Sequence, residues 1–304
     1  AGPSGETVVK CAANGMLASL DPYSFYLDPA EYADFKTDLA GAFTGGGVVI
    51  GSPGPDRPGL HRVVSPLDGG PARAAGVLPG DLIAAVDDAP AEDLSLDEIV
   101  DRLRGPRGTV VRLRVLRPPD LVAVDFAISR NVVEVEVVSA RRIGEVAVMR
   151  ISEFNEFTAR QFDREMREVK AAGAVRGVAL DLRMNSGGLM KAATEIADAF
   201  LDGGVIVEER GRGKPQPVYA TPGDIAEGAP VMVLVDRTTA SSAEVLAGAL
   251  QDRGRAKLVG EPTFGKGSIQ TVHPLSNGGG ARLTIGRFHF ASGAGVSETG
   301  LPPD

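Results

Sequence analysis

Apolar segments of strand length alternate with segments of helix length in the second half of the chain. The strand-like runs lie at 146–151, 178–180 and 231–235, and the helix-like segments lie at 158–172, 189–201 and 242–251. In the first of these helices Phe162, Met166 and Val169 are four and three positions apart, which places them on one face. This order predicts an α/β core with crossover connections. The stretch 202–230 is enriched in glycine and proline, so we expect a loop there.

A separate compact module of short elements is predicted over 41–130. Strand candidates lie at 48–50, 60–64, 82–86 and 109–116. Pro71 to Gly76 predicts a short helix that ends at its glycine, and Ser95 with Glu98 predicts the capped start of a second helix. Residues 1–40 predict a helical lead-in with turns or helix starts at Asp21 and Asp28, each followed by proline. The chain therefore divides into 1–40, 41–130 and a larger unit, 131–304.

Composition and charge narrow the class of protein. Of the 304 residues, 43% are hydrophobic and 24% are charged, so the chain can bury a sizeable core. A net charge of −8 argues against a dedicated nucleic-acid binder, which needs a cationic surface. Cys11 is the only cysteine, so neither an intramolecular disulfide nor a thiolate zinc cluster can form.

The ends of the sequence predict a trimmed or mature piece of a longer protein. The chain begins at Ala1 instead of methionine and has no signal-like apolar segment, as would an exported protein that has lost its leader. No uncharged apolar run reaches the roughly 20 residues that span a bilayer. The last residues are Leu301-Pro302-Pro303-Asp304, and we expect further sequence beyond them.

Several common active-site motifs are absent. His61, His273 and His289 are the only histidines, and none has a partner at zinc-ligand spacing, so no metal or other cofactor is predicted. A Ser-His-Asp triad stays open, because triads assemble in space and not in sequence. Residues 260–267 nearly fit a phosphate-binding loop, but Gly267 replaces the required hydroxyl residue. The strand-like segment 268–272 follows where that motif needs a helix, so we reject nucleotide binding.

Three local features could carry chemistry, and each also has a structural explanation. Lys266 lies between two glycines before an apolar strand. Partial burial there would lower its pKa and make it a general base; the alternative is a solvated lysine in a turn. Ser241 begins a helix after a buried strand, either as a nucleophile or as the cap of a Ser-x-x-Glu box with Glu244. Gly187 and Gly188 open another helix, as an oxyanion site or as an ordinary strand-to-helix turn.

Together these features resemble the carboxyl-terminal-processing (tail-specific) serine proteases that carry a PDZ domain. The resemblance covers nearly the whole chain. It rests on the lead-in 15–22, on the PDZ-like segments 63–66, 71–72, 75–77 and 80–83, and on the protease-like segments 181–183, 187–189, 247–252 and 260–268. It implies an α/β multidomain fold, with an α+β PDZ domain placed before an α/β crotonase/ClpP-like protease core.

The resemblance also implies a serine–lysine dyad. In that family the lysine follows the serine by 25 positions, which corresponds to Ser241 and Lys266 here, and a glutamine four residues later orients it, which corresponds to Gln270. The N–H groups of Gly187 and Ser242 would form the oxyanion hole. Asp252 matches a family aspartate that we expect to be structural.

The PDZ domain would receive the free C-terminus of a protein or peptide substrate. Its carboxylate loop corresponds to Gly46, Gly47 and Val48. The family also implies an exported enzyme of the bacterial periplasm or cell envelope, and it allows an adaptor or activator protein and a homo-oligomer.

Some positions depart from the family pattern. Ser186 replaces the proline of an Asn-Pro-Gly-Gly turn, Gly46 replaces an apolar residue of the carboxylate loop, and 290–293 replaces a Thr-Pro-Ser-Gly turn. Two alternatives stay open at this point. One is a catalytically inactive PDZ scaffold with a protease-like core, and the other is a histidine-dependent hydrolase.

Overall fold

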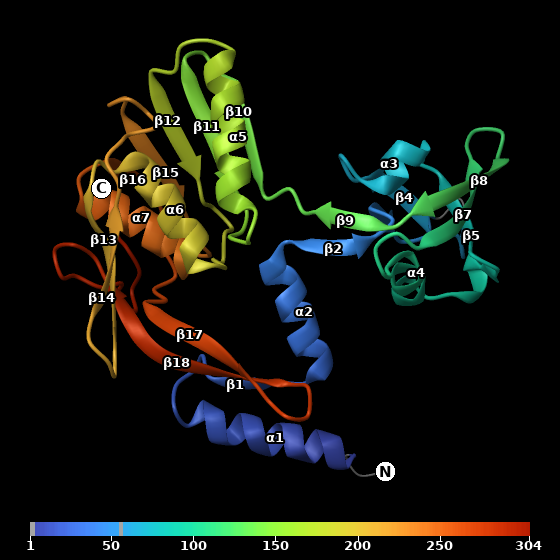
Figure 1. Cartoon of the computed structure of the whole chain (residues 1–304), viewed down its shortest axis with the longest axis horizontal. Coiled ribbons are helices and arrows are strands. Elements are labelled where there is room, and N and C mark those ends of the chain that lie inside the picture. Colours follow the sequence, from blue (N-terminus) through green and yellow to red (C-terminus); the bar gives the residue numbers. More distant parts are fainter. Residues whose placement is uncertain (1–3, 55–56) are drawn as a thin grey trace. The chain divides into compact units, whose positions relative to one another are not determined.

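The computed structural model of the chain describes residues 4–54 and 57–304, which form two compact units (Figure 1). The large unit contains residues 4–41 together with 136–304, and the small unit contains 42–135. The lead-in, which we predicted to be a separate segment, thus belongs to the same unit as the C-terminal residues. The physical reason is strand pairing, since Phe25 to Leu27 pairs antiparallel with Arg282 to Gly280.

A mainly parallel sheet forms the centre of the large unit. Its order is β10-β11-β12-β15-β16, with bounds Val138–Ile143, Val146–Ile151, Gly177–Asp181, Val231–Val235 and Ala256–Gly260. The helices α5 (Thr158–Ala171), α6 (Met190–Phe200) and α7 (Ser242–Asp252) connect these strands, and α5 runs beside β10 and β11 in Figure 1. Only β10 is antiparallel to its neighbour. The predicted crossover α/β core is confirmed.

A second sheet in the large unit has the order β1-β18-β13-β14, and β17 also pairs with β18. The bounds are β1 Phe25–Leu27, β13 Gly204–Gly211, β14 Gln216–Ala220, β17 Ser268–Pro274 and β18 Gly280–His289. The expectation of a loop over 202–230 is therefore wrong, because β13 and β14 lie there. Pro217 is tolerated because β14 lies at the edge of the sheet, where a missing N–H costs no ladder bond.

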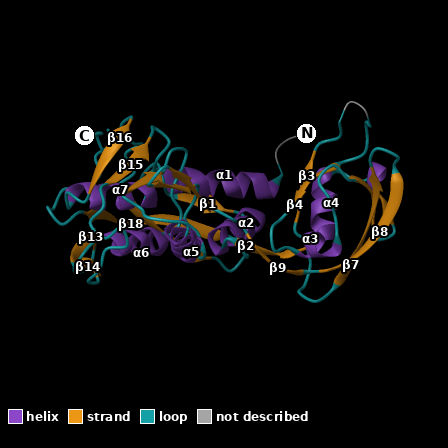
Figure 2. Cartoon of the chain, turned by 90° about the horizontal axis from the view of Figure 1, so that it is seen from above, coloured by secondary structure: helices purple, strands orange, loops and turns teal. Residues whose placement is uncertain are grey.

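Two helices of the lead-in lie beside this second sheet. These are α1 (Gly5–Ala18) and α2 (Pro29–Ala40), and Figure 2 shows both near β1 and β18. Asp28 caps α2 through a reciprocal capping box with Glu31, as the Asp-Pro pair predicted, and Gly41 ends the helix in the left-handed conformation. No helix in the described ranges is both long and apolar enough to cross a membrane.

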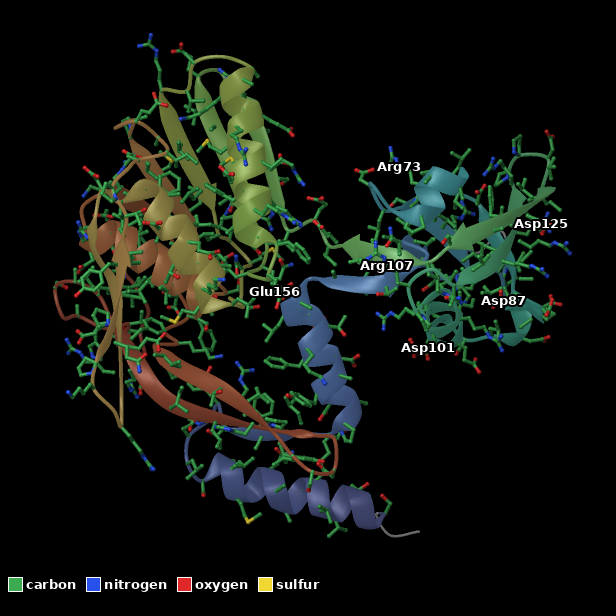
Figure 3. All side chains as sticks on the ribbon, in the orientation of Figure 1. Arg73, Asp87, Asp101, Arg107, Asp125 and Glu156 are labelled. Atoms are coloured by element: carbon green, nitrogen blue, oxygen red, sulfur yellow. The ribbon has the colours of Figure 1, made fainter. Side chains whose placement is uncertain are left out.

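The small unit is built on a sheet of order β3-β4-β5-β7-β8, with β6 paired to β5 and a separate β2-β9 pair. Its strands are β2 Ala42–Gly45, β3 Val48–Gly51, β4 Arg62–Pro66, β5 Leu82–Val86, β6 Ala89–Pro90, β7 Val110–Arg117, β8 Val122–Ser129 and β9 Asn131–Glu134. Its helices are α3 (Pro71–Ala75), α4 (Leu96–Leu103) and a 3-10 turn, Ala91–Asp93. Charged side chains such as Arg73, Asp87 and Asp125 project outward from it (Figure 3).

Candidate active site

Ser241 lies at the junction between β15 and α7, directly before the first residue of the helix. Its backbone has φ 57° and ψ −122°, a region that a residue with a side chain rarely occupies. Such a conformation costs on the order of 1–3 kcal/mol and persists where the surroundings impose it, which is common at active sites. The hydroxyl therefore sits on a strained turn at the positive end of a helix.

A buried carboxylate joins this turn to the segment that carries Lys266. Glu244 is fully buried, and its Oε2 accepts the backbone N–H of both Ser241 and Lys266 at 2.8 Å. Its Oε1 accepts the Thr263 hydroxyl at 2.5 Å and the Gly265 N–H at 2.8 Å. Because one oxygen bonds to both backbone nitrogens, Ser241 and Lys266 are held side by side although they lie far apart in the sequence.

The amine of Lys266 is partly buried and has no hydrogen-bond partner among the described residues. It lies 5.1 Å from the centre of the Tyr23 ring. Burial lowers the pKa of Lys266 from 10.5 to about 8; the nearby Arg282 cation also lowers it, whereas Glu244 raises it. About one amine in ten is then neutral at pH 7, against roughly one in three thousand at the ordinary pKa.

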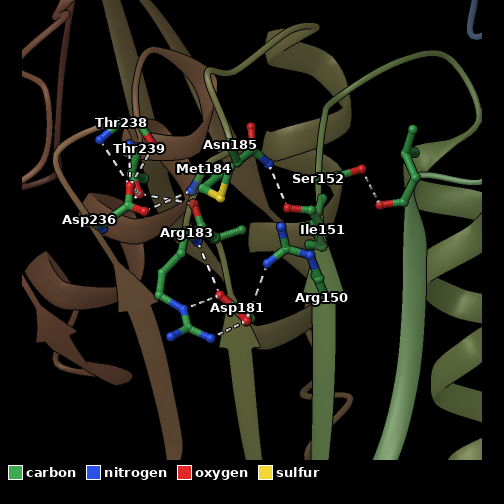
Figure 4. Close-up of polar contacts among 12 residues, drawn as sticks. Arg150, Ile151, Ser152, Asp181, Arg183, Met184, Asn185, Asp236, Thr238 and Thr239 are labelled. Atoms are coloured by element: carbon green, nitrogen blue, oxygen red, sulfur yellow. Dashed lines mark hydrogen bonds and ion pairs between the residues drawn. The ribbon is translucent and has the colours of Figure 1, made fainter.

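The loop after β12 is fastened to the loop after β15 by polar contacts (Figure 4). The carboxylate of Asp236 accepts the Met184 N–H at 3.0 Å, and the Thr239 hydroxyl donates to the Leu182 carbonyl at 2.9 Å. These bonds fix the position of the glycine pair relative to the strained serine.

The strand end before this loop is also fixed electrostatically. Arg183 forms two hydrogen bonds of 2.8 Å with Asp181, and it holds the pKa of that carboxyl below its usual value. Arg150 on β11 approaches the same carboxyl at 3.4 Å (Figure 4). The Asp-Leu-Arg sequence thus has a structural function, which is to anchor the loop.

Gly187 packs directly against the serine turn. A Cβ on it would lie 2.8 Å from the Cβ of Ser241, and its φ of +107° suits only glycine. Its N–H is already used, because it donates to Oδ1 of Asn185 at 2.8 Å. In the described part of the chain, by contrast, the N–H groups of Gly188 and Ser242 have no hydrogen-bond partner.

Gln270 does not bond to Lys266 in this structure. Its side-chain amide donates to the Ser268 hydroxyl at 2.6 Å, and its Oε1 accepts a long hydrogen bond of 3.4 Å from Arg282. The predicted orienting residue is therefore near the predicted base but is bonded to other side chains.

One cavity of about 450 Å³ brings most of these residues together. Its lining includes Ser241, Ser242, Lys266, Gln270, Gly188 and Arg282, and α2 contributes Tyr32, Phe35, Lys36 and Leu39. No histidine is among the lining residues. A cavity of this size accommodates a ligand of a few residues, and its mixed wall of apolar and polar side chains suits a peptide.

The predicted carboxylate loop lies in the small unit, whereas the cavity lies in the large unit. Gly46 and Gly47 are buried, and Gly47 has φ +74°. The Gly46 N–H donates to the Leu103 carbonyl at 3.0 Å, so it is not free for a ligand here. Val48 begins β3, which is a terminal strand in the sheet order, so one edge of this strand is unpaired within the described sheet.

Sequence reasoning missed two contributors to the site. Glu244 was recognised only as half of a capping box, since its contacts with Thr263, Gly265 and Lys266 join distant segments. Arg282 carries no motif signal. Its position in a strand that pairs with the lead-in could not be predicted from the local sequence pattern.

Within the described ranges, no group of three or more His, Cys, Asp and Glu side chains could hold a metal ion.

Comparison with known proteins identifies related sequences along nearly the whole chain. Residues 145–304 match peptidase family S41, and residues 62–117 match the PDZ domain. A carboxy-terminal-processing protease of Bartonella bacilliformis is 36% identical over 307 residues, which cover 99% of this chain and 70% of that protein. Carboxy-terminal processing protease CtpA of Bacillus subtilis is 33% identical over 301 residues, covering 98% of this chain and 63% of that protein.

A solved structure supports the same relationship. The photosystem II D1 C-terminal processing protease superposes with a TM-score of 0.58 at 32% identity, covering 98% of this chain and 81% of that one. An S41 protease from Bacteroides fragilis, at 17% identity and a TM-score of 0.54, shares the fold. The chain belongs to peptidase family S41 and is a carboxyl-terminal-processing serine protease with a PDZ domain.

Proposed function

We propose that this enzyme cleaves peptide bonds with Ser241 as nucleophile and neutral Lys266 as general base. The observation that carries the proposal is the shared Glu244 oxygen, which holds the backbones of both residues beside one cavity. The lowered pKa of Lys266 supplies a neutral amine near physiological pH.

The reaction would begin with transfer of the Ser241 proton to the Lys266 amine while the serine oxygen attacks the substrate carbonyl. The resulting ammonium would protonate the leaving amine, and water would then hydrolyse the acyl-enzyme. The N–H of Ser242 is unbonded and lies at the start of α7, where it can donate to the developing oxyanion.

Gly187 would be the second oxyanion donor once its N–H leaves the side chain of Asn185. That exchange is favourable in principle, because a hydrogen bond to a charged oxygen is stronger than one to a neutral amide. Gln270 would likewise turn from Ser268 toward Lys266 to orient the amine. Both steps are exchanges of hydrogen-bond partner.

The PDZ domain would bind the free C-terminus of the substrate. An extended peptide would add to the unpaired edge of β3, and the loop at Gly46, Gly47 and Val48 would receive its carboxylate. The bond from Gly46 to Leu103 would have to open, whereas the Gly47 N–H has no partner within the described chain. Occupancy of this site would select substrates and gate the active site.

The test is cleavage of a fluorogenic peptide with a free C-terminus by the wild type and by Ser241→Ala. The control is Ser276→Ala, which removes an exposed hydroxyl from the β17–β18 turn. We expect Ser241→Ala to lose turnover by at least about a thousandfold and Ser276→Ala to retain it. Equal turnover by Ser241→Ala and wild type would refute the serine mechanism, and no turnover by the folded wild type would favour the inactive PDZ scaffold.

The histidine-dependent alternative has a separate test. His61, His273 and His289 do not line the cavity that contains Ser241, so single His→Ala substitutions should leave turnover unchanged. Loss of turnover in a folded histidine variant would instead indicate a triad.

We further propose, from the family resemblance, that the enzyme acts after export in the bacterial cell envelope. Cell fractionation of the full-length protein tests this, and recovery only from the cytoplasm would contradict it. Light scattering of the purified chain, alone and with candidate activators, tests for a homo-oligomer and an adaptor.

A further inference from the structure

Arg282 is a partly buried cation in the catalytic cavity, and no acidic side chain of the described residues pairs with it. It lies on β18, and its guanidinium lies near two aromatic rings, 5.4 Å from the centre of Phe25 and 5.7 Å from that of Phe35. Its Nε is buried and unbonded. The long bond to Oε1 of Gln270 is the hydrogen bond that its side chain forms within the described chain.

The surroundings of this cation do not neutralise it. Burial lowers the pKa of the Arg282 guanidinium, and no carboxylate in the described part of the chain forms an ion pair with it. Leaving a guanidinium partly desolvated and unpaired costs free energy, because a charge loses solvation without gaining a counterion. A site that retains such a group is suited to an anionic ligand.

The charged side chains that line the cavity are all cations. Lys36, Lys266 and Arg282 line it, and no aspartate or glutamate does. This contrasts with a chain whose net charge is −8. Lys36 lies over the Tyr32 ring at 4.5 Å, so this cation, like Lys266 and Arg282, has an aromatic contact.

We propose that Arg282 is a specificity-determining residue that binds a carboxylate of the peptide in the catalytic cavity. Its planar guanidinium can pair with a carboxylate through two N–H donors. The carboxylate is either the side chain of an acidic residue beside the scissile bond or the terminal carboxylate of a peptide whose end enters the cavity. This inference rests on the proposed catalytic function of the same cavity and adds a preference that the PDZ domain does not supply.

A bound carboxylate and Gln270 would compete for the guanidinium of Arg282, and this competition would link substrate binding to catalysis. A carboxylate on Arg282 would take the donor that now bonds weakly to Oε1 of Gln270, and this would free Oε1 to accept a hydrogen bond from the Lys266 amine. A preferred substrate would therefore help to place the orienting residue.

The experiment compares wild type, Arg282→Gln and Arg287→Gln with paired peptides. Arg287 is the matched control, because it lies on the same strand, is exposed and does not line the cavity. One peptide pair differs only in Glu or Gln beside the scissile bond and keeps one C-terminus. A second pair consists of a short hexapeptide with a free acid or an amide at its C-terminus. The ratio of kcat/KM within each pair is measured at one pH above 8.

We expect wild type and Arg287→Gln to prefer the carboxylate form of at least one pair by about tenfold or more, and Arg282→Gln to lose that preference. The pair that responds identifies the source of the carboxylate. Because the PDZ domain is the same in all three proteins, its own preference for a free C-terminus cancels in the comparison. An unchanged ratio in Arg282→Gln, or no preference in the wild type, would overturn the inference.

A binding measurement separates this inference from the catalytic proposal. Titration calorimetry with the Ser241→Ala protein and the same peptides reports carboxylate recognition without turnover. If the preference for the carboxylate peptide disappears in the double variant Ser241→Ala/Arg282→Gln, the inference is supported even when the wild type cleaves nothing. If the preference persists in the double variant, the inference is rejected even when the dyad is active.

Discussion

Replacing Lys266 by methionine should stabilise the folded protein at neutral pH while abolishing activity. Methionine keeps the length and the apolar stem of lysine but has no charge to desolvate. In the wild type the folded state holds this amine at a pKa of about 8, against 10.5 in an exposed lysine. The folded state therefore binds fewer protons than the unfolded state between these two values, and the stability of the wild type rises with pH across that window.

The magnitude follows from the same two values. At about 1.36 kcal/mol per pKa unit, the full difference sets an upper bound of roughly 3 kcal/mol for the cost of the charged amine below pH 8. Because the side chain is only partly buried, solvent screening reduces the expected effect to about 1–2 kcal/mol. Lys266→Met should recover this amount at pH 7 and lose most of the gain by pH 10.

The assay is urea unfolding at pH 7 and pH 10, followed by circular dichroism. Lys214→Met is the control, because Lys214 is exposed on the loop between β13 and β14. The decisive quantity is the change between the two pH values, since packing of the new side chain is independent of pH. A stability difference between Lys266→Met and wild type that is the same at both values would refute the lowered pKa.

Three further substitutions test the packing around the site. Glu244→Gln places amide hydrogens against N–H donors that now face a carboxylate. We therefore expect a loss of about 2–4 kcal/mol in unfolding free energy and at least a tenfold fall in kcat. Near-normal values of both would contradict the proposal that Glu244 holds Ser241 and Lys266 side by side. Gly187→Ala puts a Cβ 2.8 Å from that of Ser241, so turnover should fall at least about a hundredfold, whereas Gly213→Ala, which meets open space, should leave turnover unchanged. Gly248→Ala drives a methyl group into the Phe290 ring and should cost about 1–3 kcal/mol in urea unfolding, a prediction that fails if the stability is unchanged.

The parts of the fold that the sequence predicted are those that local chemistry determines. Ser95 with Glu98 and Asp28 with Glu31 form capping boxes at the expected helix starts. The parallel strand β12 contains the continuous apolar run 178–180 because both of its faces are covered. The strands β13 and β14 were not predicted, because this stretch is rich in glycine and proline, which usually indicate turns. A strand at the edge of a sheet can contain proline, and Pro217 lies on such a strand, β14.

The site was less accessible to sequence reasoning than the fold. Ser241 and Lys266 were singled out as local features and were paired only through a family spacing. The structure adds that both residues line one cavity. The partners that Gly187 and Gln270 now have, Asn185 and Ser268, could not be foreseen, because a hydrogen-bond choice among several nearby groups depends on atomic positions. The same is true of the aromatic contacts that hold Arg282.

The most direct test of the serine–lysine dyad is the rate at which a fluorophosphonate reagent modifies Ser241 as a function of pH. Mass spectrometry of wild type and Lys266→Met would identify the modified residue and give the rate without any substrate. We expect the wild-type rate to rise through a pKa near 8, as the amine loses its proton, and Lys266→Met to remain slow at every pH. Equal rates and the same pH dependence in both proteins would contradict the account.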